Sequence, residues 1–362
     1  MKRIWTTRSF EQGDEERIFE LWQSVNPKGE FNREKWMAWW VWKYWKNPAG
    51  KPIIWLALDQ DRLIGHYAII PIRMRIGNEI IVGSQSVDTM THPDYRHQGI
   101  FETLASKTYE QAVKEEVHII YGFPNRFSYP GFVNKLGWFD ISVLHTMIMP
   151  LNLTNVLRKY IQNKYILHTC AVGGNLLLEL LHNNNGTSRI NKVKTHPISA
   201  FDERVDYFWD KISSLYQITV VRDKSYLNWR FADMPNTNPI IYTAEKDKEI
   251  LGFIVLTTKS VHDLKFGYIA DVAALPSAKH TYQDLISTAM WYFSSQKVDL
   301  ISYQGIGNKA CQRTLMKNGF LFSRFIDKRF HFIARVNTSK VSDVFLKNSR
   351  HWFVQRGDAD SM

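Results

Sequence analysis

The chain has 362 residues, 44% of them hydrophobic, and a formal net charge of +11 from 46 Lys and Arg against 35 Asp and Glu. This length predicts about two domains of roughly 150 residues each, with enough apolar side chains to fill their cores. The sequence contains no run of roughly 20 apolar residues, the length that a membrane span requires. Its two cysteines are isolated, which favours neither a disulfide framework nor a zinc site or other metal site.

The charge pattern leaves the kind of partner open. An excess of basic residues favours anionic partners such as a phosphorylated cofactor, nucleic acid, an acidic glycan or a membrane surface. The basic residues are scattered along the chain, so a generally basic solvated surface is the alternative. The N-terminus lacks the apolar run of a signal peptide, and we expect a cytoplasmic protein.

In chain order, the first half predicts a helix, a strand hairpin, a third strand and a second helix. A helical segment over 33–44 precedes two strand-like runs, 53–58 and 63–72, which are separated by a polar turn. A strand over 82–90 then leads through a turn into a segment of helical period. A short apolar strand over 117–123, another helix and further strands complete this half.

The second half repeats this order of elements. Ile53 pairs with Ile240 at a shift of 187 (240 − 53 = 187), and Asp88 pairs with Asp271 at a shift of 183 (271 − 88 = 183). An ordered register over most of a domain is typical of two tandem copies, although two unrelated α/β domains remain the alternative. The predicted class is α/β (α+β), with a mixed, mostly antiparallel sheet flanked by helices in each copy.

We assign the first copy to residues 1–150 and the second copy to 201–336. The connecting segment, 151–200, contains a leucine-rich run over 176–181 that predicts a short amphipathic helix and an asparagine-rich run over 183–186 that predicts a turn. Residues 337–362 form a C-terminal tail.

The most informative stretch lies between the 82–90 strand and the helix that follows it. It reads Arg96-His97-Gln98-Gly99-Ile100-Phe101. A strand, a tight basic turn and a helix start together present free backbone N–H groups and a positive helix end to an anion. Gly99 allows a phosphate to approach the main chain, and Arg96 adds positive charge.

Together with a second motif, this stretch resembles the GNAT superfamily of acyl-CoA N-acyltransferases. The run from His92 to Ile100 is similar to the family's loop for the acyl-CoA pyrophosphate. Asn125, followed by a helix that ends in Lys135-Leu136-Gly137-Trp138, is similar to the family's second motif. The resemblance covers residues 1–150 and extends to 200–336 as a diverged copy. Tandem chains of this type resemble bacterial proteins associated with polysaccharide or cell-envelope genes.

The resemblance implies acyl-CoA, most simply acetyl-CoA, as co-substrate. Its pantetheine arm would lie along the strand that ends at Met90, and its pyrophosphate would lie over the glycine loop. The backbone N–H of Met90 would hold the thioester oxygen as it becomes an oxyanion. The implied cofactor-binding residues are Thr89, Met90, Thr91, Arg96, His97, Gln98, Gly99, Ile100, Phe101 and Asn125.

The catalytic assignments follow the same resemblance, with two departures from the family pattern. Val133 stands where the family often has an acid tyrosine, so Tyr129, one turn earlier, is the candidate acid, with a core aromatic as the alternative. Asp88 is the candidate base, although its repeat partner Asp271 also favours a structural carboxylate. Phe101 stands where the family usually has a small residue, and a large side chain is accommodated there if it points into the sheet.

The second copy is expected to have lost the co-substrate. A constant shift of 183 aligns the loop 96–101 with 279–284, which places Tyr282 at the position of Gly99 and Asp284 near the pyrophosphate. A bulky side chain and a negative charge there would exclude the anion. We therefore expect this copy to be a scaffold or an acceptor-binding surface.

An aromatic segment over 36–45 borders the acceptor cleft in the resembling fold. On a helix these rings point in all directions, so they cannot all share one buried face. Trp42 repeats as Trp229, which favours packing between the copies for that pair. The candidate acceptor-binding residues are Trp36, Trp40 and Trp45, whose rings would stack on a sugar, with core packing as the alternative.

The function that the resemblance implies is acyl-CoA-dependent N-acyl transfer. The acceptor would be a small-molecule or glycan amine, such as an amino sugar or a cell-envelope precursor. One alternative is a Fem-like transferase that uses aminoacyl-tRNA, but that chemistry needs no pyrophosphate loop, so we do not expect a nucleic-acid partner. Another alternative is a non-catalytic acyl-CoA-binding protein. The sequence leaves a homo-oligomer open.

Overall fold

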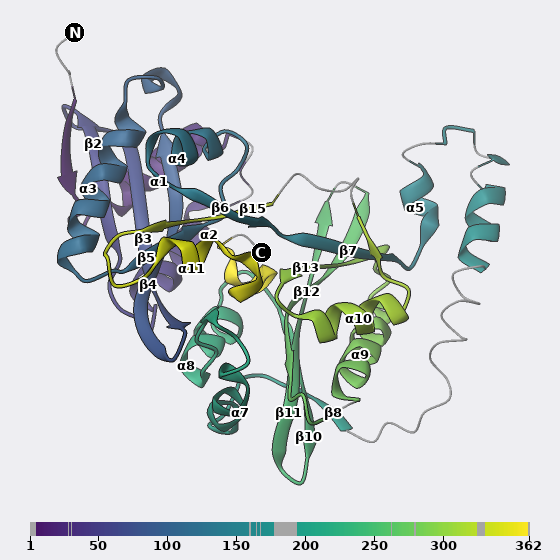
Figure 1. Cartoon of the computed structure of the whole chain (residues 1–362). Coiled ribbons are helices and arrows are strands. Elements are labelled where there is room, and N and C mark those ends of the chain that lie inside the picture. The colour runs from purple at the N-terminus through teal and green to yellow at the C-terminus, as the bar shows by residue number, and fades with distance from the viewer. Residues whose placement is uncertain are drawn as a thin grey trace.

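The computed structural model describes residues 5–27, 29, 31–158, 161–163, 165–166, 168–176, 194–261, 263–278, 280–323 and 330–360. Two halves, each made of strands flanked by helices, share one sheet (Figure 1). This arrangement confirms the predicted α/β (α+β) class with mostly antiparallel strands.

The elements follow the predicted order in both halves. The first half contains β1 (Thr6–Ser9), α1 (Glu15–Val25), α2 (Arg33–Trp40), β2 (Ile53–Asp59), β3 (Arg62–Ile76), β4 (Glu79–Thr91), α3 (Ile100–Lys114), β5 (Ile119–Gly122), α4 (Tyr129–Lys135), β6 (Phe139–Val143) and β7 (His145–Pro150). The second half contains α5 (Leu153–Arg158), β8 (Lys194–Ile198), α7 (Arg204–Ser213), β9 (Ile218–Val220), α8 (Lys224–Leu227), β10 (Ile240–Lys246), β11 (Glu249–Val261), β12 (Leu264–Ala274), α9 (Thr281–Ser295), β13 (Leu300–Ile306), α10 (Lys309–Lys317), β14 (Leu321–Phe322), β15 (His331–Val336), α11 (Asp343–Lys347) and β16 (Trp352–Gln355). Short π-helical turns, η1 (Val41–Trp45) and η3 (Asn228–Ala232), extend α2 and α8, and 3-10 turns lie at η2 (Pro93–Tyr95), η4 (Ser349–His351) and η5 (Arg356–Asp358).

Strands cross between the two halves of the 16-stranded sheet. Twelve of its strands follow the order β6-β15-β5-β4-β3-β9-β16-β13-β12-β11-β10-β8, and β1, β2, β7 and β14 pair outside this path. β7 pairs with β13 of the second half, with Met147 opposite Tyr303, whereas β15 pairs with β5 and β6 of the first half. β7 and β15 therefore pair across the expected boundaries at residues 150 and 336, and each half of the sheet includes a strand from the other.

The C-terminal segment, expected to be a tail, is built into the centre of the sheet. β16 pairs in parallel with β9, with Trp352 opposite Ile218, and antiparallel with β13. Figure 1 shows the C-terminal end between the two halves. The helix predicted over 176–181 lies outside the described residues beyond Leu176, and the turn predicted over 183–186 lies outside them altogether.

The repeat is visible as a contact between equivalent residues. A shift of 187 relates both ends of β2 to those of β10 (240 − 53 and 246 − 59), and both ends of η1 to those of η3 (228 − 41 and 232 − 45). Trp42 Nε1 donates to the Trp229 carbonyl at 2.6 Å, and Trp229 Nε1 donates to the Trp42 carbonyl at 2.9 Å. Their rings stack 5.2 Å apart. Such reciprocity is that of a two-fold contact, so the predicted packing of this pair between the halves is confirmed.

A glycine that recurs in both halves lets a helix start close to the sheet. A Cβ on Gly65 would meet Ile100 at 2.5 Å, and a Cβ on Gly252 would meet Thr281 at 2.8 Å. Ile100 and Thr281 are the first residues of α3 and α9. In the first half, α3 and α4 pack on one face of the sheet, and α1 and α2 pack on the other. Among the described helices, none has the length and hydropathy needed to cross a membrane.

Candidate active site

The parallel strands β4 and β5 separate part way along the sheet. Their register pairs Ser84 with Ile120 and Gln85 with Tyr121, and no described strand pairs with that edge of β4 beyond Gln85. The separation opens a cleft of about 410 Å³, whose walls come from α1 on one face and α4 on the other. Its lining includes Trp22, Asp88, Thr89, Met90, Asn125 and Asp360.

A β-bulge in β4 places Asp88 and Thr89 at this opening. The β3–β4 register shifts between His66 and Ala68, and Asp88 has a φ of 48°, in the left-handed region. His66 Nδ1 lies 2.7 Å from the Asp88 carbonyl oxygen, a contact that supports the bend. A bulge bends the strand and redirects the backbone N–H and C=O groups at that point, so it determines which groups of Asp88 and Thr89 lie at the cleft.

The glycine loop connects η2 with α3 and contains two left-handed residues. His97 has a φ of 64°, and Gly99, with a φ of 78°, is the N-cap residue of α3. A Cβ on Gly99 would have no heavy atom within 4 Å, so open space adjoins this glycine. A left-handed residue followed by a helix start forms a concave set of backbone N–H groups, which suits an anion. Arg96 and Gln98, both expected at the pyrophosphate, flank His97 in this loop.

Two side-chain contacts hold the turn that leads into the glycine loop. Tyr95 Oη donates to Asp59 at 2.6 Å, and Arg62 lies 2.8 Å from His92 Nε2. Burial and the positive charge of Arg62 lower the pKa of His92, which favours the neutral ring in this contact. The loop is therefore shaped by the protein itself, before any ligand binds.

Phe101 is accommodated by a glycine on the neighbouring helix. Its ring packs against Tyr67 of β3 and Phe132 of α4, with centroids 6.1 Å and 5.1 Å apart. A Cβ on Gly131 would lie only 2.5 Å from Phe101 Cε1. The ring thus meets the condition for accommodating a large side chain here, and it fills the space that a side chain at position 131 would need.

Asn125 lines the cleft and shapes the turn into α4. Its Oδ1 accepts hydrogen bonds from the backbone N–H groups of Phe127 at 2.8 Å and Ser128 at 3.1 Å. These bonds form a turn ahead of the helix and not an N-cap, because the N-cap residue of α4 is Ser128. Its role toward acyl-CoA stays a prediction.

Asp88, which lines the cleft, is held by two buried neighbours from η1. Lys43 Nζ lies 2.9 Å from Oδ2, and Tyr44 Oη donates to the same oxygen at 2.6 Å. Burial and the Asp88 charge raise the pKa of Tyr44, which keeps the phenol protonated as a donor. These contacts suit a structural carboxylate, and the assignment of Asp88 as the base stays a prediction.

Sequence reasoning missed the second carboxylate of the cleft, Asp360. It follows η5 and lies 3.8 Å from Lys43 Nζ. Burial raises the pKa of Asp360, and the positive charge of Lys43 opposes this effect. No local pattern could have linked it with Asp88, because the fold brings together two residues that lie 272 positions apart in the chain (360 − 88 = 272).

Tyr129, the candidate acid, lies beside the cleft and is not among its lining residues. Its hydroxyl donates to Asp140, and its ring centroid lies 4.1 Å from that of His331 on β15. Asp140 Oδ1 in turn lies 3.1 Å from His331 Nδ1. The structure therefore does not bring Tyr129 into the cleft lining with Asp88, and its role as acid stays a prediction.

Two of the three predicted acceptor-binding tryptophans are buried. Trp36 and Trp40 are each 1% exposed, so the expectation that their rings can stack on a sugar is wrong. They stack on each other 5.2 Å apart, which is the core-packing alternative. Trp45 is 45% exposed but contacts Phe10 outside the cleft lining. The tryptophan that lines the α1 side of the cleft is Trp22.

The loop before α9, residues 275–280, contains no glycine that could match Gly99. A shift of 181 relates both ends of α3 to those of α9 (281 − 100 and 295 − 114), whereas a shift of 183 relates the end of β4 to that of β12 (274 − 91). The second loop is thus two residues shorter, and the predicted pairing of Tyr282 with Gly99 is wrong. His280, with a φ of −106°, takes the N-cap position, and Tyr282 corresponds to Phe101. Asp284 is buried within α9 and does not lie at the loop.

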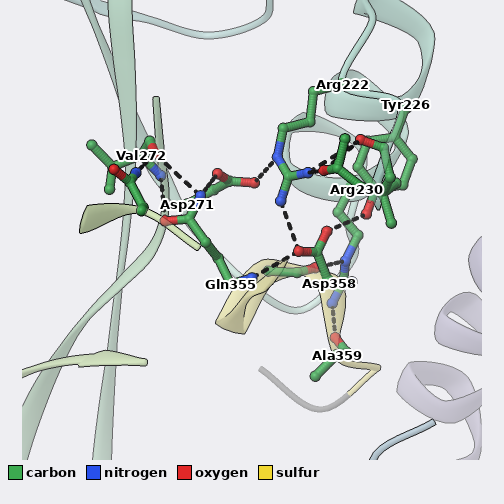
Figure 2. A network of polar contacts seen from close by, with 12 residues as sticks. Arg222, Tyr226, Arg230, Asp271, Val272, Gln355, Asp358 and Ala359 are labelled. Carbon is green, nitrogen blue, oxygen red and sulfur yellow. Dashed lines mark hydrogen bonds and ion pairs between the residues drawn. The ribbon is translucent and has the colours of Figure 1, made fainter. Parts of the chain in front are cut away.

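The C-terminal segment fills the corresponding gap beside β12. The side-chain amide of Gln355 accepts from the Val272 N–H at 3.2 Å and donates to the Val272 carbonyl at 3.1 Å. Val272 is the repeat equivalent of Thr89 (272 − 89 = 183). Figure 2 shows Gln355 reaching Val272. In the second half, an amide of the chain itself therefore occupies the place that is open beside β4 in the first.

Comparison with known proteins identifies the class of the first half. Residues 6–139 match the family described as acetyltransferase (GNAT) domain. No curated protein matches the sequence. Residues 6–139 therefore belong to the GNAT superfamily, as the loop and the second motif predicted.

Solved structures extend the similarity to almost the whole chain. A GCN5-related N-acetyltransferase from Anabaena variabilis matches 92% of this chain and 73% of its own, with a TM-score of 0.62 and 10% identity. A probable N-acyltransferase from Enterococcus faecalis matches 92% and 72%, with a TM-score of 0.62 and 12% identity. N-myristoyltransferase from Saccharomyces cerevisiae, with bound myristoyl-CoA, matches 93% and 83%, with a TM-score of 0.59 and 13% identity. At these identities the likeness defines the fold.

Proposed function

We propose that the protein is an acyl-CoA-dependent N-acyltransferase whose active site is the cleft of the first half. The observation that carries this proposal is the open edge of β4, which leads to the Gly99 loop. The equivalent place in the second half is filled by Gln355 and has no left-handed glycine. The second half then serves as a scaffold that also supplies β15 and Asp360 to the first.

The residues around the cleft suit the parts of an acyl-CoA. The pyrophosphate would meet the N–H groups at the start of α3 and the charge of Arg96. A pantetheine amide would form hydrogen bonds with the backbone of Thr89, in the same way that the Gln355 side-chain amide forms hydrogen bonds with the backbone of Val272. The thioester would then lie near Met90, whose backbone N–H would stabilise the oxyanion by about 3 kcal/mol.

The proposed reaction is attack of a primary amine on the thioester, with acetyl-CoA as the simplest donor. The yeast structure similar to this chain holds myristoyl-CoA, so the acyl length is a variable for the assay. The proposed acceptors are small-molecule or glycan amines, such as amino sugars or cell-envelope precursors. Binding of acetyl-CoA without turnover on any such amine would favour the non-catalytic alternative.

The test is calorimetric titration of acetyl-CoA into the full chain and into Gly99→Ala. A Cβ at this position would stand in the open space that we assign to the pyrophosphate, and we expect affinity to fall at least tenfold. Gly77→Ala is the matched control, because Gly77 also has a positive φ, of 59°, and no atom within 4 Å of its Cβ. Both variants carry a similar strain of about 1 kcal/mol.

Only Gly99→Ala should lower the affinity for acetyl-CoA, because Gly77 lies in the turn between β3 and β4, away from the glycine loop. Equal affinities of the two variants and the wild type would contradict the assignment of the loop. Absence of acetyl-CoA binding by the wild type would contradict the proposed function itself.

A further inference from the structure

The C-terminal segment is fixed in place immediately before Asp360. Arg222, which is fully buried, binds Asp358 at 2.7 Å (Figure 2). Arg230, also buried, donates from Nε to the Gly357 carbonyl at 2.6 Å. These buried contacts tie the segment to the rest of the fold, so Asp360 enters the cleft from a rigid support rather than from a free chain end.

Asp360 and Asp88 share one buried lysine, but their contacts differ. Both oxygens of Asp88 lie within 3.1 Å of Lys43 Nζ, and Oδ2 also accepts from Tyr44. Asp360 lies 3.8 Å from Lys43 Nζ, beyond hydrogen-bond distance, and 26% of its side chain is exposed. The charged groups that act on Asp360 are Lys43 of η1, Asp88 of β4 and Arg230 of η3. Of the two carboxylates, Asp360 is the more exposed and the less tightly held by Lys43, so it is the better placed to accept a new donor.

The cleft takes its lining residues from both faces of the sheet. The glycine loop starts α3, which packs with α4 on one face. Lys43 and the aromatic residues around it belong to η1 and α2, which pack with α1 on the opposite face. Because the cleft has lining residues from both faces, an acyl-CoA on the α3 side would present its thioester toward Asp360.

We propose that the Asp360 carboxylate binds the protonated amine of the acceptor and takes a proton from it. This inference rests on the proposed function and names the acceptor as a cationic primary amine. One proton passes from R–NH₃⁺ to Asp360, and the nitrogen lone pair forms a C–N bond with the thioester carbon. The C–S bond breaks, the thiolate takes the second nitrogen proton, and Asp360 returns its proton to water. An amide and free coenzyme A result.

The test uses the full chain saturated with coenzyme A and titrated with n-butylamine, with n-butanol as the neutral probe of equal length. We expect saturable binding of butylamine and no saturable binding of butanol. Asp360→Asn, which keeps the size of the side chain, should weaken butylamine at least tenfold and leave acetyl-CoA affinity within twofold. The control for charge is Asp343→Asn, an exposed carboxylate on α11, which should change neither affinity.

A wild type that does not bind butylamine, or an Asp360→Asn variant that binds it as well as the wild type does, overturns this inference. Neither result touches the proposed function, which depends on acetyl-CoA and the glycine loop. With acetyl-CoA and a panel of primary amines, we further expect kcat of Asp360→Asn to fall at least about 100-fold. A kcat within threefold of the wild type would overturn the proton-accepting role.

Discussion

Replacement of Gly131 by alanine tests the contact that accommodates Phe101 in the glycine loop. The new Cβ would lie 2.5 Å from Phe101 Cε1, and the ring is packed between Tyr67 and Phe132. Overpacking of this kind costs about 1–3 kcal/mol, whereas alanine in place of a helical glycine gains up to about 1 kcal/mol. We expect Gly131→Ala to lower the free energy of unfolding by about 1–2 kcal/mol.

The sign should reverse once the ring is removed. In a Phe101→Ala background the ring that the new Cβ would contact is absent, so Gly131→Ala should be neutral or should stabilise the fold by up to about 1 kcal/mol. The double-mutant cycle then gives a coupling energy of about 1–3 kcal/mol. Urea denaturation followed by tryptophan fluorescence measures all four free energies. Equal destabilisation by Gly131→Ala in both backgrounds would refute this reasoning.

Two further predictions concern the joint between the halves. Burial raises the pKa of Asp271 to about 6 from its ordinary value of 3.8. The protonated Asp271 side chain therefore stabilises the fold fully below about pH 4, and this stabilisation is lost as the pH rises through about 6. The loss amounts to at most about 3 kcal/mol. Asp271→Asn should therefore lessen the fall in unfolding free energy between pH 5 and pH 7.5, and an unchanged fall would count against the assignment. Trp42→Phe leaves the buried Trp229 carbonyl without its indole donor and should cost about 1–3 kcal/mol in urea denaturation, whereas Trp291→Phe, 66% exposed, should cost less than about 0.5 kcal/mol. Similar costs for the two tryptophan variants would show that the reciprocal contact contributes little.

Features that depend on neighbours in the sequence were predictable. The shift of 187 that relates the early part of the two copies identified β2 with β10 and led to the Trp42–Trp229 pair. The glycine loop was recognisable because a left-handed residue at a helix start requires only local backbone geometry and an open flank. Thr89, Met90 and Asn125 followed from the resemblance of the two motifs, and the cleft lining includes all three.

Features that depend on which elements pack together were not predictable from these patterns. Trp36 and Trp40 were expected at a binding surface, but α1 and β3 bury them, and the aromatic pattern of a single helix does not say how many sides are covered. The predicted pairing of Tyr282 with Gly99 was wrong because the loop before α9 is two residues shorter than the loop before α3. An alignment at one fixed shift could not reveal this deletion.

The sequence by itself predicted the repeated order of elements, the α/β class and the glycine loop at the start of α3. Only the tertiary structure decided that β7 and β15 cross between the halves, that Gln355 fills the second cleft and that Asp360 enters the first. The physical reason is that these contacts join residues far apart in the chain, through main-chain pairing and buried ion pairs that leave no periodic pattern in either partner.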